Sequence, residues 1–208
     1  MTADRGAENA RDVRDARATV QALLAAHGET YAMEAGIRLR DTPQPLYQLL
    51  VLAMLLSARI RTPTAGATWQ RRRDVLDEGG YRRYDERTAT RLGDAAQLLL
   101  DRYDGDLRKA RAAADGDAER LCRLLREVPG IGPVGAGVFL REVQAVWPEF
   151  APAFDGKVLQ GAQRLELPGT AGEPAELVPE GEEAVLAAAL VRAAVDRKIA
   201  GKVLASML

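Results

Sequence analysis

Two short segments of this sequence carry residue types that suit chemistry on an anionic substrate. The first holds Gly130, Ile131, Gly132, Pro133 and Val134. Because glycine permits backbone angles that other residues avoid, we expect both glycines to shape a tight turn, with Ile131 filling the gap between two helices. Proline suits the first turn of the second helix. Backbone N–H groups at such a helix start bind anions, phosphate above all; an ordinary helical hairpin is the alternative.

The second segment reads Phe154-Asp155-Gly156-Lys157-Val158. Asp155 stands where the next helix is predicted to begin, and aspartate is a favoured N-cap because its carboxylate accepts backbone N–H bonds. Lys157 follows two residues later. Three roles stay open for it: a phosphate contact, a nucleophilic amine, or a solvated surface lysine.

Helical elements are predicted to position both segments. Apolar residues recur at helical spacing over most of the chain, and β-branched runs are scarce. We therefore expect an all-α protein, with one long buried helix running from about Pro43 to Ala58. The other predicted helices cover residues 10–26, 62–69, 72–78, 87–103, 107–114, 118–128, 133–146, 156–165 and 182–206.

The charge balance argues only mildly against a nucleic-acid partner. The net charge of the 208 residues is −1, whereas binding to a phosphate backbone depends on cations. Residues 56–91, however, hold nine arginines and five acids, while residues 165–185 hold six glutamates and no base. This asymmetry favours a surface with a positive side. The alternative is that Arg71-Arg72-Arg73 is only a solvated helix face.

Several kinds of site are disfavoured by composition. Cys122 is the only cysteine, so the chain cannot form an internal disulfide or hold a four-cysteine iron–sulfur cluster. His27 is the only histidine, so Ser–His–Asp catalysis would have to use it. No metal-ligand spacing is evident. The longest apolar run, Leu49 to Leu56, is too short to span a membrane, and the polar N-terminus is unlike a signal peptide. We expect a cytoplasmic protein, associated with the nucleoid if bacterial.

The chain resembles the helix-hairpin-helix DNA glycosylase superfamily, whose best-known branch is endonuclease III-like. The resemblance covers about residues 41–165, in order. It is carried by the glycine turn and by four further segments. Leu55-Leu56-Ser57-Ala58-Arg59 is similar to the family's Leu-Leu-Ser-Ala-Gln, and residues 76–105 are similar to the helix pair before the hairpin. Trp147-Pro148 is similar to Gly-Trp-Pro, and Phe154-Asp155-Gly156-Lys157-Val158 to Val-Asp-Thr-His-Val.

The resemblance implies an enzyme that removes a damaged or mispaired base from double-stranded DNA. Asp155 would be the catalytic carboxylate, facing positive charge at the sugar as in glycoside hydrolysis. Val134 stands where bifunctional members carry a lysine that forms a Schiff base, which implies a monofunctional glycosylase with water as nucleophile. Arg59 would replace the glutamine that fills the gap left by the flipped base.

The family's arrangement also implies two helical lobes with a cleft between them. Residues 41–134 would form the central lobe with the hairpin, and residues 1–40 plus 135–208 the second. Gly130, Ile131, Gly132, Val134, Arg59 and Lys157 would contact DNA. We expect a monomer with no cofactor and no iron–sulfur cluster; a monovalent cation at the hairpin is left open.

Three alternatives remain at this point. The first is a non-catalytic helix-hairpin-helix DNA-binding protein. The second is a bifunctional glycosylase and abasic-site lyase that uses another amine, Lys157 or the N-terminus. The third is a helical protein unrelated to DNA.

Overall fold

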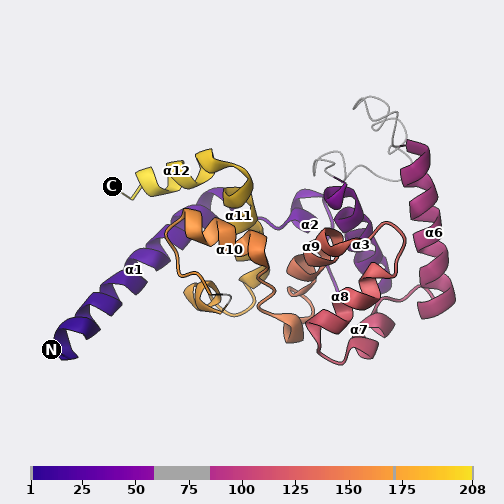
Figure 1. Ribbon diagram of the computed structural model, residues 1–208, viewed down its shortest axis with the longest axis horizontal. Helices are drawn as coiled ribbons and strands as arrows, with labels where there is room; N and C mark the ends of the chain where they lie inside the picture. The colour runs from indigo at the N-terminus through magenta and orange to yellow at the C-terminus, as the bar shows by residue number, and fades with distance from the viewer. Residues whose placement is uncertain (1, 59–84, 171, 208) are drawn as a thin grey trace. The chain divides into compact units, whose positions relative to one another are not determined.

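The structure is a computed structural model that describes residues 2–58, 85–170 and 172–207 (Figure 1). These residues are helical with no strand among them, which confirms the all-α prediction. Arg59 and the predicted helices at 62–69 and 72–78 lie outside the described residues. Among the described helices, none is both long and apolar enough to cross a membrane.

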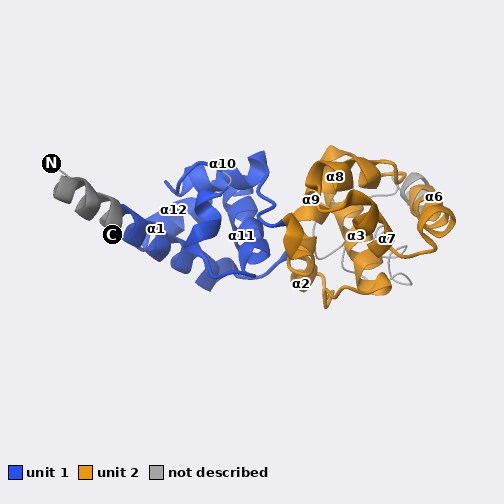
Figure 2. Ribbon diagram, turned by 90° about the horizontal axis from the view of Figure 1, so that it is seen from below, with its two compact units in different colours: residues 1–30, 151–208 blue, residues 31–150 orange. Residues whose placement is uncertain are grey.

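Two compact units divide the chain (Figure 2). Unit 2 is the continuous stretch 31–150, and unit 1 combines residues 1–30 with residues 151–208. The division therefore falls at residues 30/31 and 150/151, not at the expected residues 41 and 134.

The difference has a physical cause within unit 2. Glu142, buried in α9 (Pro133–Val143), accepts hydrogen bonds from the backbone N–H groups of Tyr31 (3.2 Å) and Ala32 (2.7 Å). These bonds tie the start of α2 (Tyr31–Glu34) to the end of α9. Residues 31–40 and 135–150 therefore belong with the central unit.

Unit 2 is built around α3 (Pro43–Ser57), as the sequence predicted. Eight of its residues are buried, and Pro43 stands at its first turn, where the missing N–H costs nothing. Helix α3 packs against α9 (Pro133–Val143), which also contacts α8 (Ala118–Arg126). The remaining elements of unit 2 are α2 (Tyr31–Glu34), α6 (Asp85–Tyr103), α7 (Arg108–Ala114) and the 3-10 turn η1 (Pro148–Phe150).

Unit 1 is centred on α11 (Glu183–Val195), an alanine-rich helix with nine buried residues. Helix α10 (Gly156–Arg164) packs mainly against α11, and α1 (Thr2–His27) contacts both α11 and α12 (Arg197–Ala205). The 3-10 turn η2 (Glu173–Leu177) contacts α1.

The single helix predicted over 182–206 is wrong. The backbone of Asp196 is extended (φ −113°, ψ 109°), and its side chain accepts a hydrogen bond from the Lys198 N–H. Asp196 therefore ends α11 and caps α12. The apolar pattern continues across the break, which is why spacing alone did not reveal it.

Candidate nucleic-acid interface

The turn between α8 and α9 is shaped by Gly130. Its φ is +92°, in the region that favours glycine, and a Cβ atom there would lie 2.9 Å from the Met54 sulfur of α3. Ile131 is 4 % exposed and its N–H donates to the Val128 carbonyl at 3.0 Å. Gly130 thus has the backbone angle predicted for it, and Ile131 is part of the buried core of unit 2.

Gly132 has a different role from the one predicted. Its backbone is extended (φ −96°, ψ −173°), a conformation that any residue adopts, so no special angle requires glycine there. A Cβ atom at Gly132 would meet nothing within 4 Å. Among the described residues, nothing occupies the space that a side chain at this position would take.

At the N-terminus of α9, Pro133 and Val134 are exposed, whereas Gly135 is buried. Gly132 is the N-cap residue and has no side chain with which to cap the helix. Pro133 has no N–H, so Val134 and Gly135 supply the first-turn N–H groups that point along the helix axis. The Val134 side chain is 66 % exposed. This turn therefore has the features of an anion site, although valine itself offers no nucleophile.

Asp155 caps α10, as its position predicted. Its Oδ1 atom accepts hydrogen bonds from the Lys157 N–H at 2.9 Å and the Val158 N–H at 3.1 Å. The side chains on either side anchor the cap, since Phe154 and Val158 are buried. The carboxylate is thus held in one orientation at the start of a helix.

Lys157 lies two residues after Asp155, in the first turn of the same helix. Its Nζ donates to the Gln160 Oε1 at 2.7 Å, and the side chain is exposed. Both residues line an open hollow of about 770 Å³ on unit 1, together with Gln163 and Glu166. Lys157 is therefore accessible to a phosphate, with its amine already engaged by a neutral amide.

The structure sorts the predicted site residues into two sets. Gly130, Ile131, Gly132 and Val134 lie together at one turn of unit 2. Asp155 and Lys157 lie together at the start of α10 in unit 1. Among the described residues, no group of three His, Cys, Asp or Glu side chains is placed to hold a metal ion.

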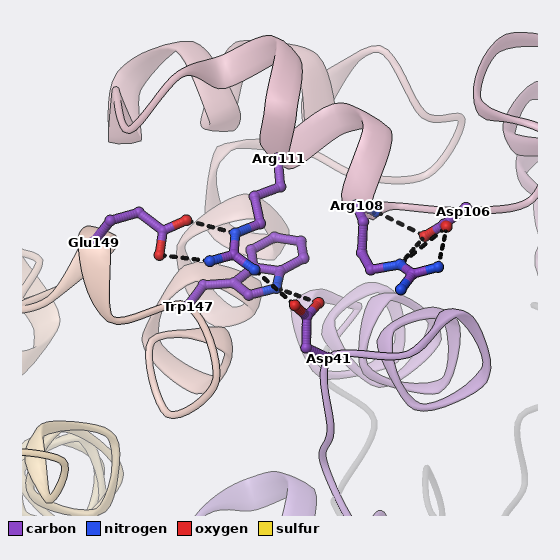
Figure 3. Close-up of polar contacts among 6 residues, drawn as sticks. All are labelled: Asp41, Asp106, Arg108, Arg111, Trp147 and Glu149. Atoms are coloured by element: carbon purple, nitrogen blue, oxygen red, sulfur yellow. Dashed lines mark hydrogen bonds and ion pairs between the residues drawn. The ribbon is translucent and has the colours of Figure 1, made fainter.

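A charged network in unit 2 was not predicted (Figure 3). Arg111 reaches from α7 to Glu149 through two bonds, Nε to Oε1 at 2.5 Å and Nη2 to Oε2 at 2.9 Å. Its Nη1 donates to Asp41 Oδ2 at 2.7 Å, while Trp147 Nε1 donates to Asp41 Oδ1 at 2.8 Å. The guanidinium also stacks over the Trp147 ring, 5.3 Å from its centroid.

Electrostatics within this network favour the ionised forms. The hydrogen bonds from Arg111 lower the pKa of Glu149 below its ordinary value, and Glu149 in turn raises the pKa of Arg111. The network joins the segment before α3 to α7 and η1. Its partners are far apart in sequence, so no local spacing could have revealed it.

Comparison of the chain with protein-family models, with curated proteins and with solved structures gave no match.

Proposed function

We propose that the chain is a monofunctional DNA glycosylase that cleaves the N-glycosidic bond of a flipped, damaged base in double-stranded DNA. The observation that carries the proposal is the open N-terminus of α9. Its N-cap is a glycine, which has no side chain to cap the helix, and apart from its chain neighbours no described residue lies within 4 Å of a Cβ atom built on that glycine. A helix start in this state suits a phosphate of the DNA backbone, which positions the protein without reading sequence.

Asp155 supplies the catalytic carboxylate in this proposal. Its fixed orientation at the start of α10 suits a group that must face positive charge developing at the sugar carbon. The nucleophile is water, because the exposed side chain at the hairpin is valine. Water adds to the sugar, the base departs, and the product is an abasic site with an unbroken strand. The protein acts as a monomer in this proposal.

A non-catalytic DNA-binding protein is the second candidate. The observation that favours it is the cap itself, because two backbone bonds on Oδ1 are sufficient reason for an aspartate at residue 155. The two proposals differ in what Asp155→Asn does. An asparagine keeps an oxygen for the cap but has no charge for catalysis.

The first test uses end-labelled duplexes that each carry one lesion: uracil, hypoxanthine, 8-oxoguanine, an oxidised pyrimidine, an alkylated base or an abasic site. Each reaction is split and analysed with and without hot alkali. Cleavage that needs alkali, and that is lost in Asp155→Asn, is the expected result. Full activity in Asp155→Asn would overturn the role of Asp155. Cleavage without alkali would point to a lyase that uses another amine.

The second test addresses the α9 N-terminus with a matched pair of variants. Gly132→Asp and Gly132→Asn both fit the open space and both can cap α9, so neither should unfold unit 2. Only aspartate adds a negative charge. We expect Gly132→Asp to weaken binding of an undamaged duplex at least tenfold more than Gly132→Asn does. Equal binding by the two variants would remove the α9 N-terminus from the interface.

A further inference from the structure

A second positive surface lies in unit 2, at the N-terminal end of α3. An open hollow of about 680 Å³ is lined there by Arg38, Arg40, Thr42, Gln44 and Gln48, among others. None of the described residues that line it is acidic. We call this feature the α3 hollow; its described lining carries two positive charges, several uncharged polar groups and no negative charge.

Arg38 and Arg40 point to the same side because the residues between and before them are packed against the core. Ile37 and Leu39 pack against the core of unit 2, whereas Arg38 and Arg40 are exposed. Burial thus alternates along residues 37–40, as in an extended chain. Side chains two residues apart in extended backbone point the same way, with Cα atoms roughly 7 Å apart.

The positive charge of the α3 hollow is not neutralised by the described residues. Neither Arg38 nor Arg40 forms an ion pair or a side-chain hydrogen bond with them. The adjacent acid is Asp41, whose two carboxylate oxygens are already occupied, one by Arg111 and the other by Trp147 (Figure 3). Both oxygens of the adjacent carboxylate are thus engaged by Arg111 and Trp147 rather than by Arg38 or Arg40.

The arginines, and not the helix start, supply most of the attraction for an anion. Pro43 and Pro45 have no N–H, so the first turn of α3 offers only the Gln44 N–H to the hollow. Thr42 is the N-cap residue, but its side chain makes no capping bond, which leaves its hydroxyl available. Planar guanidinium groups bind phosphate oxygens through paired N–H donors, with more geometric selectivity than an ammonium.

We propose that the α3 hollow is a phosphate-binding site in which Arg38 and Arg40 hold two neighbouring phosphate groups or one diphosphate. Two sources share this chemistry, the backbone of a nucleic acid and a small phosphorylated compound. The site does not depend on catalysis at Asp155 or on the α9 N-terminus.

The test compares two double variants of the full chain with equal loss of charge. Arg38→Gln/Arg40→Gln removes the proposed site. Arg14→Gln/Arg17→Gln removes two exposed arginines of α1 in unit 1. Titration calorimetry with inorganic pyrophosphate and with succinate measures the small anions, and fluorescence anisotropy with a 20-base-pair undamaged duplex measures the nucleic acid. Thermal melts establish that each variant is folded.

Support consists of at least a tenfold loss of affinity for pyrophosphate or for the duplex in Arg38→Gln/Arg40→Gln, with little change in Arg14→Gln/Arg17→Gln. A loss with pyrophosphate alone identifies a small phosphate compound as the ligand. A loss with the duplex, with a salt dependence lowered by about 1 per arginine, identifies a nucleic-acid backbone. Arg38→Lys/Arg40→Lys keeps the charge and should bind at an intermediate level.

Three results would overturn the proposal: no effect on either ligand, an equal effect in the α1 control, or succinate binding as tightly as pyrophosphate. Gly132→Asp separates this site from the proposed function. This variant should leave pyrophosphate binding unchanged even where duplex binding is lost. The pyrophosphate titration therefore tests the α3 hollow alone, and the duplex titration of Gly132→Asp tests the proposed function.

Discussion

Gly161 in α10 lies directly against the backbone of Leu190 in α11. A Cβ atom on Gly161 would stand 1.9 Å from the Leu190 carbonyl oxygen and 2.6 Å from its carbonyl carbon. The two helices therefore approach at a distance that only glycine allows, next to the alanine-rich face of α11. Since Asp155 caps α10, this contact also fixes where the carboxylate lies within unit 1.

Substitution of Gly161 by alanine should separate α10 from α11. The methyl group meets backbone atoms that cannot rotate away, so we expect a loss of about 1–3 kcal/mol or more in the free energy of unfolding. Gly201→Ala in α12 is the matched control, because a Cβ atom there meets nothing within 4 Å; it should be neutral or slightly stabilising. Urea unfolding measures both. A Gly161→Ala variant as stable as Gly201→Ala would contradict the packing described.

Three substitutions at Asp155 separate the helix cap from catalysis. Asp155→Ala removes the oxygen that accepts from the Lys157 and Val158 N–H groups, and should lower stability by about 1 kcal/mol. Asp155→Asn and Asp155→Ser keep a capping oxygen, so their melting temperatures should stay close to that of the unchanged protein. All three should lack glycosylase activity. An active Asp155→Ser variant would limit the residue to capping.

Val134→Lys tests whether the hairpin faces the sugar. The Val134 side chain is 66 % exposed, so a lysine fits there without disturbing the core. If the hairpin binds DNA as proposed, the new amine should form a Schiff base at an abasic site, which borohydride traps as a covalent adduct. The unchanged protein should give no adduct, and Val134→Gln serves as the uncharged control. Trapping by Val134→Gln would assign the amine to another residue.

The Arg111–Glu149 ion pair should make the free energy of unfolding of unit 2 depend on pH. Hydrogen bonding from Arg111 lowers the pKa of Glu149 in the folded protein below its ordinary value of 4.5, so the ionised form is favoured by folding. Stability from this pair is present above that value and is lost as the pH falls through the lower, folded-state pKa.

Glu149→Gln should therefore be less stable than the unchanged protein at pH 7, by up to about 1 kcal/mol for a pair this exposed. The difference should shrink as the pH falls below 4.5 and should decrease in high salt. Urea unfolding at a series of pH values provides the measurement. A difference that stays constant from pH 7 to pH 3 would exclude the ion pair as its cause.

Local signals in the sequence predicted much of the helical structure. Proline at a helix start marked Pro43 and Pro133, and the N-cap preference of aspartate marked Asp155. Each of these depends on interactions within a few residues. The buried character of α3 was equally readable, because its apolar residues cover all sides of the helix.

Features that depend on distant residues were not predicted. The unit boundaries follow from Glu142 binding the start of α2, more than a hundred residues earlier in the chain. The close approach at Gly161 depends on which helix happens to pack there. For Gly132, the sequence predicted a backbone angle that favours glycine. The structure shows an ordinary extended angle at this residue, with no described atom, apart from those of its chain neighbours, within 4 Å of the position that a Cβ would take. Arg59 stays a prediction.

The division of the chain has a consequence for its synthesis. Unit 2 is one uninterrupted stretch, residues 31–150, so all its residues leave the ribosome before α10, α11 and α12 exist. Helix α1 is made before unit 2, yet its partners α11 and α12 are made after it. Until then Val20 and Leu23, buried in the finished protein, have no partner helix to cover them. While unit 2 is being made, the nascent chain thus carries the apolar residues of α1 without the helices that bury them.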